Sequence, residues 1–350
     1  MHSLKDLGWC EHFEIQLAAG TDWVPARVAE ETRELYRIFC EQGEFLAELS
    51  GRLRHEIESR ADFPAVGDWV LLQLRIGENR ATIHRVLQRK GKFSRKIAGR
   101  RTEEQIVAAN VDVVFLVSSL NREFNPRRIE RYLSLAWDSG ARPVLVLNKA
   151  DLCENAEAFR AVAEDAAMGA RVILASAVRG DGLAELSAIL QNGTTAALLG
   201  SSGVGKSSLI NTLLDDEHLR TRAVRESDDR GRHTTTSRQL IVVPSGGVLI
   251  DTPGMRELQL WDAGEGIEHA FGEIAELASR CKFRDCRHQS EPGCAVREGM
   301  VAERLANYHK LLREEQFLEA KQDAGVRSER TKELRKLMKS VNQFYRDRGR

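Results

Sequence analysis

The first hundred residues alternate apolar and polar positions with the two-residue period of β-strands. Residues 41–44 lie between two alternating stretches and predict a hairpin turn. About five short antiparallel strands are expected, and they predict a small barrel of the OB-fold type. Such barrels either bind nucleic acid or serve only as packing modules, and the fold alone does not distinguish the two. The alternating stretches are Phe13, Ile15 and Leu17; Tyr36, Ile38 and Cys40; Phe45, Ala47 and Leu49; and residues 67–72 and 81–86.

Continuous apolar runs replace this alternation after residue 104, as expected of strands that are buried on both faces of a parallel sheet. Residues 126–136 have helical spacing and separate the first two runs, which predicts a strand–helix–strand unit. Beyond residue 301 the apolar positions have the spacing of an amphipathic helix. The predicted strands are residues 111–117, 143–147, 171–174, 196–199 and 248–250, and the apolar positions of the last helix are Leu305, Tyr308, Leu311, Leu312 and Phe317.

The stretch from Gly200 to Ser207 is a complete phosphate-binding loop. Its small residues let backbone N–H groups surround a polyphosphate, Lys206 can reach the terminal phosphates, and Ser207 can place its hydroxyl on Mg²⁺. A strand precedes the loop and a helical pattern follows it, so the loop is expected at a helix N-terminus, which attracts anions. A chance match in a flexible linker is the alternative, and the flanking strand and helix count against it.

Two further strand ends predict a site for the guanine base. The strand at 143–147 is followed by Asn148-Lys149-Ala150-Asp151. The carboxylate of Asp151 can accept hydrogen bonds from both the ring N–H and the exocyclic amine of guanine, while Asn148 contacts its other edge. The next strand is followed by Ser176 and Ala177, whose backbone N–H groups can reach the guanine carbonyl. Adenine lacks this pair of donors, so the motif selects guanine.

Two more motifs are typical of a nucleotide switch. The strand at 248–250 leads into Asp251-Thr252-Pro253-Gly254, where Asp251 would hold Mg²⁺ through water and the Gly254 N–H would sense the terminal phosphate. The preceding polar stretch, residues 231–236, offers the hydroxyls of Thr235 and Thr236 to Mg²⁺ from a switch loop. Together the four motifs predict a GTPase.

The order of these motifs is unusual, because the guanine-specific residues precede the phosphate loop. A circular permutation explains this order, since the sheet requires only that strands be neighbours in space. Met255 follows Gly254, where many GTPases have a glutamine that orients the attacking water. A slow intrinsic rate is therefore expected. His233 is the candidate for positioning water, and an ordinary exposed loop residue is the alternative.

The formal net charge of the 350-residue chain is zero, so its overall charge does not indicate a nucleic-acid partner, and only local runs of charge are informative. Residues 89–101 carry many cations and no acid, and they either contact phosphates or form a solvated linker. Residues 327–350 are also basic, and their alternatives are RNA contact or a solvated helix. No signal-peptide core and no apolar run of membrane length is present, so a cytoplasmic protein without a membrane contact is expected.

Three of the six cysteines cluster with a histidine, namely Cys281, Cys286, His288 and Cys294. In a reducing compartment this cluster predicts a metal site before it predicts disulfides. Three thiolates and one imidazole complete a closed tetrahedral zinc site, which is normally structural because no coordination position is left for water. Free cysteines in the core are the alternative.

The order of the motifs resembles that of the RsgA family, the bacterial small ribosomal subunit biogenesis GTPases. The resemblance covers essentially the whole chain and implies an OB-fold barrel in residues 1–104, a circularly permuted GTPase domain in 105–265 and a zinc-binding, mainly helical domain in 266–350. It also implies a role in late maturation of the small subunit, contacts with its rRNA, and hydrolysis of GTP to GDP that the subunit stimulates. A monomer that uses Mg²⁺ with GTP and one structural Zn²⁺ is expected.

The resemblance carries the family's nucleotide contacts to Asn148, Lys149, Asp151 and the loop residues Gly200, Ser201, Ser202, Gly203, Val204, Gly205, Lys206, Ser207 and Ser208, and its zinc ligands to the four clustered residues. Two other functions stay open at this point. One is a nucleotide-gated RNA-binding regulator in which turnover is secondary, and the other is a metabolic kinase, against which the guanine-specific residues count.

Overall fold

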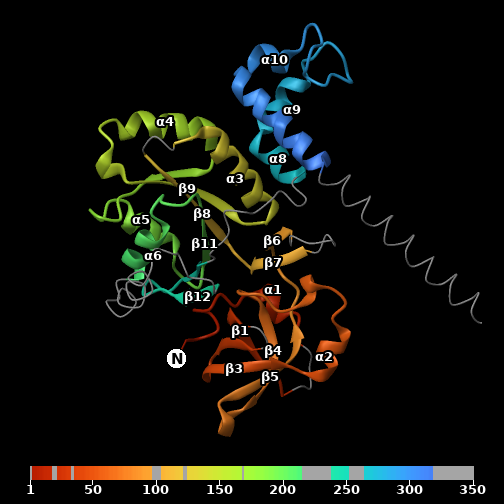
Figure 1. Cartoon of the computed structure of the whole chain (residues 1–350), viewed down its shortest axis with the longest axis vertical. Coiled ribbons are helices and arrows are strands. Elements are labelled where there is room, and N and C mark those ends of the chain that lie inside the picture. The colour runs from red at the N-terminus through yellow and green to blue at the C-terminus, as the bar shows by residue number, and fades with distance from the viewer. Residues whose placement is uncertain are drawn as a thin grey trace, which may run out of the picture.

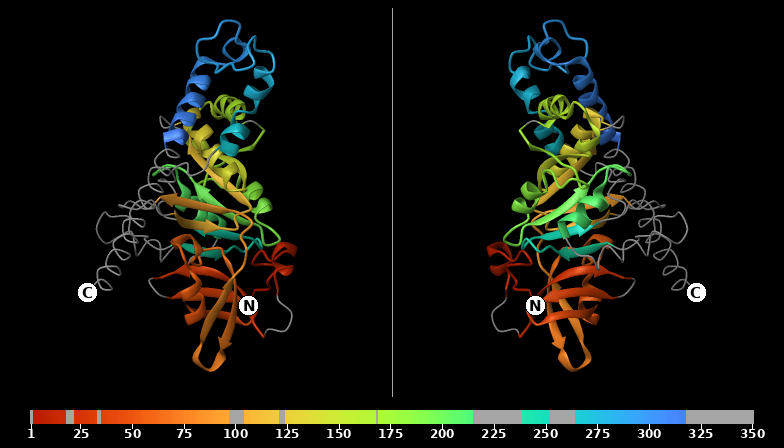
Figure 2. Two further views of the ribbon diagram at one scale, coloured as in Figure 1. Left: turned by 90° about the vertical axis from the view of Figure 1, so that its right-hand side faces the viewer. Right: turned by 90° about the vertical axis from the view of Figure 1, so that its left-hand side faces the viewer.

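The computed structural model describes residues 2–17, 22–32, 35–96, 104–120, 124–167, 169–214, 238–251 and 264–317. Three bodies follow one another along the long axis of the molecule (Figure 1): a β-barrel, a central α/β layer and a group of C-terminal helices. Two further views show the same order, with the barrel and the C-terminal helices at opposite ends (Figure 2). Within the described residues, no helix combines the length and the apolar character that crossing a membrane requires.

The N-terminal body is a closed five-stranded barrel, which confirms the predicted architecture. The closing pairs are β1–β2, β2–β3, β3–β5, β5–β4 and β4–β1. One part of the prediction is wrong, because β3 and β5 run parallel rather than antiparallel. The strands are β1 (Val24–Glu31), β2 (Tyr36–Cys40), β3 (Gly43–Leu49), β4 (Trp69–Arg75) and β5 (Arg80–Val86), and the short helices around them are α2 (Gly51–Glu56), η1 (Arg60–Asp62) and η2 (Ile76–Glu78).

The alternation at Phe13, Ile15 and Leu17 does not form a strand. Glu11–Glu14 is a short helix, α1, and the first barrel strand is β1, which the pattern did not indicate. Only Phe13 of the three apolar residues is buried, against Trp69, whereas Ile15 is 75% exposed. One helical turn can bury a single side chain as well as a strand can, so the two-residue spacing did not indicate which of the two conformations forms.

The central body contains six neighbouring strands in the order β10-β9-β8-β11-β13-β12, of which only β12 is antiparallel to its neighbour β13. The sheet continues into the barrel, because β12 also pairs with β1 through Gln239 and Glu30. The strand that leads into the phosphate loop, β11, lies in the middle of the sheet, although β8, β9 and β10 precede it in the chain. This arrangement confirms the circular permutation. The strands are β8 (Val113–Ser119), β9 (Arg142–Asn148), β10 (Arg171–Leu174), β11 (Thr195–Leu199), β12 (Gln239–Val242) and β13 (Val248–Asp251).

Helices cover both faces of this sheet because successive residues of its buried strands point to opposite sides. Val114 and Leu116 of β8 share a core with α3 and the C-terminal helices, whereas Val113, Phe115 and Val117 face α5 and α6. The helices are α3 (Pro126–Asp138), η3 (Ala150–Leu152), α4 (Ala156–Ala167), α5 (Leu183–Ile189) and α6 (Lys206–Leu214).

The basic segment at 89–101 is partly a paired strand, since it contains β6 (Lys92–Lys96), which pairs with β7 (Glu104–Ala109). Residues 97–101 lie outside the described residues. Three of its cations form ion pairs at 2.6–2.8 Å: Arg89 with Asp68, Lys90 with Asp112, and Lys92 with Glu104. These three cations therefore have partners within the protein.

Arg27 of β1 joins the barrel to the central sheet from a fully buried position, with 1% of its surface exposed. Its guanidinium donates to Thr195 Oγ1 at 2.8 Å, to the carbonyls of Gly67 and Asn110 at 3.2 Å, and to the carbonyl of Leu7. Burial lowers the pKa of Arg27 to about 10, against the opposing effect of nearby carboxylates, so the side chain stays charged at neutral pH.

We expect Arg27→Met to lower the free energy of unfolding by roughly 3–5 kcal/mol, because it leaves several buried acceptors without a donor. Urea denaturation of the full chain measures this change. Arg52→Met is the matched control, since the Arg52 side chain is 88% exposed and should matter little. Equal stability of the two variants would show that the buried contacts of Arg27 are dispensable.

The C-terminal body consists of α8 (Gly264–Ala270), α9 (Gly272–Ala278), α10 (Ala295–Gly299) and a helix over residues 302–317, which confirms the helix predicted beyond residue 301. Arg304 of the last helix lies between Glu130 of α3, at 2.6 Å, and Glu273 of α9, at 2.5 Å. Burial raises the pKa of Glu130, and the charge of Arg304 opposes this rise. The buried ion pair fixes the C-terminal body on α3.

Candidate functional site

The phosphate loop connects the end of β11 to the start of α6, as the sequence predicts. Its glycines permit close contacts: Gly205 has φ of +96°, and a Cβ there would lie 2.3 Å from Asn148 Nδ2. Lys206 Nζ donates to the carbonyls of Gly200 and Ser201 at 2.7 Å. The exposed members of the loop and of the first helical turn are Ser202, Gly203, Ser207 and Ser208, while Val204 is buried beneath them.

The guanine-motif residues lie directly against this loop. Asn148, at the end of β9, is 2% exposed and donates through Nδ2 to the Val204 carbonyl at 2.8 Å. Lys149 adopts a left-handed conformation with φ of +61°, and its ammonium reaches the Gly203 carbonyl at 2.7 Å. Both side chains thus hold the phosphate loop against the segment that was predicted to bind the base.

Asp151 is oriented by the neighbouring strand end. The hydroxyl of Ser176 donates to Asp151 Oδ1 at 2.7 Å, and the Ala150 N–H donates to the Ala175 carbonyl at 3.1 Å. Ala177 accepts from the hydroxyl of Thr212 on α6 at 3.3 Å. The two predicted guanine segments and the phosphate-loop helix therefore form one connected unit.

Asp251 is the last residue of β13, the strand beside the phosphate-loop strand. Burial raises the pKa of its carboxyl, and the positive charge of Lys206 opposes the rise. A cation at this position would stabilise the ionised form, as expected of a carboxylate that helps to hold a metal ion. The predicted residues His233, Thr235, Thr236 and Gly254 lie outside the described residues.

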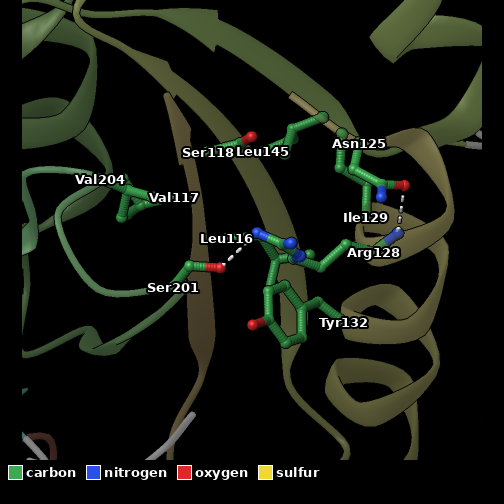
Figure 3. Close-up of a pocket in the computed structure, with 10 residues that line it drawn as sticks. All are labelled: Leu116, Val117, Ser118, Asn125, Arg128, Ile129, Tyr132, Leu145, Ser201 and Val204. Atoms are coloured by element: carbon green, nitrogen blue, oxygen red, sulfur yellow. Dashed lines mark hydrogen bonds between the residues drawn. The ribbon is translucent and has the colours of Figure 1, made fainter. Parts of the chain in front are cut away.

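Arg128 is a residue of this site that the motifs did not reveal. It lies in the first turn of α3, and its guanidinium donates to Ser201 Oγ of the phosphate loop at 2.7 Å (Figure 3). Asn125 caps the same helix by accepting from the N–H groups of Arg127 and Arg128. No sequence signal identifies Arg128, because it precedes Ser201 by 73 positions and follows no phosphate-binding pattern.

The predicted metal ligands come together between α9 and α10. The ligand atoms of Cys281, Cys286, His288 and Cys294 all lie within 4.8 Å of one another. His288 Nδ1 is 3.6 Å from Cys281 Sγ and 3.5 Å from Cys294 Sγ, and these two sulfurs are 4.0 Å apart. A tetrahedral zinc with ordinary bond lengths requires edges of about 3.8 Å between sulfurs and about 3.6 Å between sulfur and nitrogen. Cys281, His288 and Cys294 therefore have the spacing of a tetrahedral metal site, and Cys286 lies close enough to supply the fourth ligand.

Neighbouring groups hold these ligands in position. His288 has φ of +59°, and its carbonyl contacts His309 Nε2 of the last helix at 3.1 Å. Glu291 accepts backbone hydrogen bonds from Arg287 and from the two residues after His288, at 2.9–3.0 Å. These hydrogen bonds lower the pKa of Glu291 to about 2. Such outer contacts orient metal ligands.

Comparison with known proteins gives a consistent result. The family model described as RsgA GTPase matches residues 86–261. The chain is 46% identical over 327 residues to small ribosomal subunit biogenesis GTPase RsgA 2 of Lactiplantibacillus plantarum, with 91% of this chain and 92% of that protein covered. It is also 46% identical over 332 residues to small ribosomal subunit biogenesis GTPase RsgA of Opitutus terrae, with 90% of each covered.

Solved structures share the fold. The crystal structure of YjeQ from Thermotoga maritima superimposes with a TM-score of 0.64 at 28% identity, over 84% of this chain and 99% of that one. YloQ, described as a circularly permuted GTPase, superimposes with a TM-score of 0.61 at 25% identity, over 86% of this chain and 97% of that one. The similarity thus includes the barrel and the central sheet together.

Proposed function

Because the chain belongs to the RsgA GTPase family, we propose that it binds GTP at the loop from Gly200 to Ser207 and acts in late maturation of the small ribosomal subunit. Hydrolysis to GDP is then accelerated by the subunit and times release from it. The observation that supports this proposal is that the side chains of Asn148 and Lys149 donate to carbonyls of the phosphate loop, so the proposed guanine site adjoins the proposed triphosphate site.

Each predicted residue has a role in this proposal. Asp151 accepts from the guanine N–H groups, with Ser176 orienting its carboxylate. On nucleotide binding, Lys206 exchanges the loop carbonyls for the terminal phosphates. Ser207 and Asp251 are the residues that would hold Mg²⁺, which supplies charge neutralisation of the phosphates when bound. The roles of His233, Thr235, Thr236 and Gly254 stay predictions.

The Cys3His cluster is proposed to hold one structural Zn²⁺, since its donor set and edge lengths suit a closed tetrahedral site. We also propose the three-part division at residues 1–104, 105–265 and 266–350. The barrel, the basic segment at 89–101 and the basic tail at 327–350, which lies outside the described residues, would contact rRNA, and the zinc-binding domain would relay the state of the switch. The proposed partner implies action in the cytoplasm, and the chain is proposed to act as a monomer.

Hydrolysis measured with purified small subunits, with large subunits and with neither tests this function. We expect slow turnover alone, a clear acceleration with small subunits only, and loss of that acceleration in Lys206→Ala. Subunit affinity measured with GDP and with a non-hydrolysable GTP analogue should differ. Equal rates in all three mixtures, together with nucleotide-dependent subunit binding, would instead favour an RNA-binding regulator in which turnover is secondary.

A further inference from the structure

A basic groove lies between the first turn of α3 and the helix over residues 302–317. It encloses about 460 Å³, and its polar lining consists of Asn125, Arg127, Arg128, Asn307, Lys310 and Arg313. Four of these side chains are cationic and none of the lining residues is acidic. The two walls come from segments that are far apart in the chain. The Asn307 side chain donates to the carbonyl of Arg127, which is 180 positions away.

Two carboxylates beside this α3 groove are paired with other cations. Glu130 binds Arg304 at 2.6 Å, and Glu314 binds Arg131 at 2.6 Å. In the described part of the chain, no carboxylate lies within salt-bridge distance of Arg127, Lys310 or Arg313. Because the net charge of the whole chain is zero, this local gathering of cations is not a by-product of a generally basic protein.

The walls of the groove are fixed before any ligand binds. Asn307 is only 7% exposed, and its amide donates to the Glu130 carboxylate and to the Arg127 carbonyl. On the opposite wall, the Asn125 side chain caps α3 by accepting from Arg127 N at 3.0 Å and Arg128 N at 3.3 Å. These hydrogen bonds order the two walls of the groove, while the side chains of its four cations stay exposed to solvent.

We propose that the α3 groove binds backbone phosphates of RNA in the small ribosomal subunit. The lining contains no aromatic side chain on which a base could stack and no carboxylate that could accept from a base. Lys and Arg side chains arranged in this way bind phosphates without reading sequence. This inference rests on the proposed function, because the RNA is that of the proposed partner.

The test removes two charges from the groove in the full chain, with Arg127→Gln and Lys310→Gln combined. Binding to purified small subunits is measured across a range of KCl concentrations with a non-hydrolysable GTP analogue. We expect weaker binding and a slope of log affinity against log salt that is shallower by roughly 1 for each lost phosphate contact, hence by about 2. Melting temperature and metal content verify that the variant is folded.

The control removes two charges elsewhere, with Arg142→Gln and Arg171→Gln, two exposed cations of the central sheet that lie outside the groove. Its salt slope should equal that of the unmodified protein. If the unmodified protein binds subunits and the groove variant has the control's affinity and slope, the groove proposal alone fails. If the unmodified protein binds no subunits, the proposed function fails as well. Titration with inorganic pyrophosphate tests whether the groove is instead a site for a small anion. The RNA assignment would be overturned if the groove variant no longer bound pyrophosphate but still bound subunits as the unmodified protein does.

Discussion

Asp151→Asn is expected to lower the affinity for GTP by roughly 100-fold and to raise the affinity for xanthosine triphosphate. Guanine presents two donors to the Asp151 carboxylate, whereas asparagine offers one acceptor and turns an N–H₂ group toward the exocyclic amine. Losing one charge-assisted hydrogen bond and leaving one donor unpaired costs about 3 kcal/mol, which corresponds to roughly 100-fold in affinity. Xanthine has a carbonyl in place of the amine and accepts from the asparagine.

The affinities of both nucleotides, measured by titration calorimetry, check this expectation. Asp181→Asn is the control, because Asp181 is exposed in the same region and interacts with Ser176 through its backbone carbonyl. In Asp151→Asn the Ser176 hydroxyl can still donate to the oxygen of the new side-chain amide, so the loop conformation should persist. Unchanged discrimination between GTP and xanthosine triphosphate would place the guanine site elsewhere.

Cys294→Ser is expected to remove the bound metal ion and to unfold the C-terminal body at a lower temperature. Cys294 is 2% exposed, and its sulfur accepts from the Arg297 N–H at the start of α10, so it is both a proposed metal ligand and a helix cap. Four ligands of a structural zinc together contribute about 10–16 kcal/mol to folding, which is roughly 3 kcal/mol for each. The remaining three ligands leave an open, weaker site.

Metal content by elemental analysis and thermal unfolding with and without a chelator measure this effect. Cys10→Ser is the matched control, because Cys10 lies outside the cluster. The chelator should lower the melting temperature of the control but change that of Cys294→Ser little. A full equivalent of metal retained by Cys294→Ser would contradict the assigned ligand set.

The sequence alone determined those features that depend on short stretches of chain. Buried strands such as β9 and β10 have continuous apolar runs, and the phosphate loop has a fixed spacing of glycine, lysine and serine. The four metal ligands lie within 14 consecutive residues, from Cys281 to Cys294, so their spacing indicated the cluster before the structure placed them together. The order of the motifs also predicted the permuted sheet, because strand adjacency follows from the motifs each strand carries.

Prediction failed where the local pattern was compatible with two conformations. The spacing of Phe13, Ile15 and Leu17 suits a strand, but contact with Trp69 required only one buried side chain, and a helical turn formed. Strand β6 was hidden in a basic segment because its pairing with β7, rather than an apolar face, holds it in place. In the first region a partner 56 positions away, Trp69, decided the conformation, and in the second the pairing with a strand 8 to 17 positions away did so.

Only the tertiary structure revealed the roles of Arg27, Arg128 and the α3 groove. Arginine is common on protein surfaces, so its type and position gave no indication that Arg27 would be buried between two bodies or that Arg128 would reach Ser201. The groove exists because Glu130 and Arg304 bring the last helix onto α3 and place Lys310 and other cations near Arg127. The contacts between the last helix and α3 join residues more than 170 positions apart, and no local pattern of apolar and polar residues encodes them.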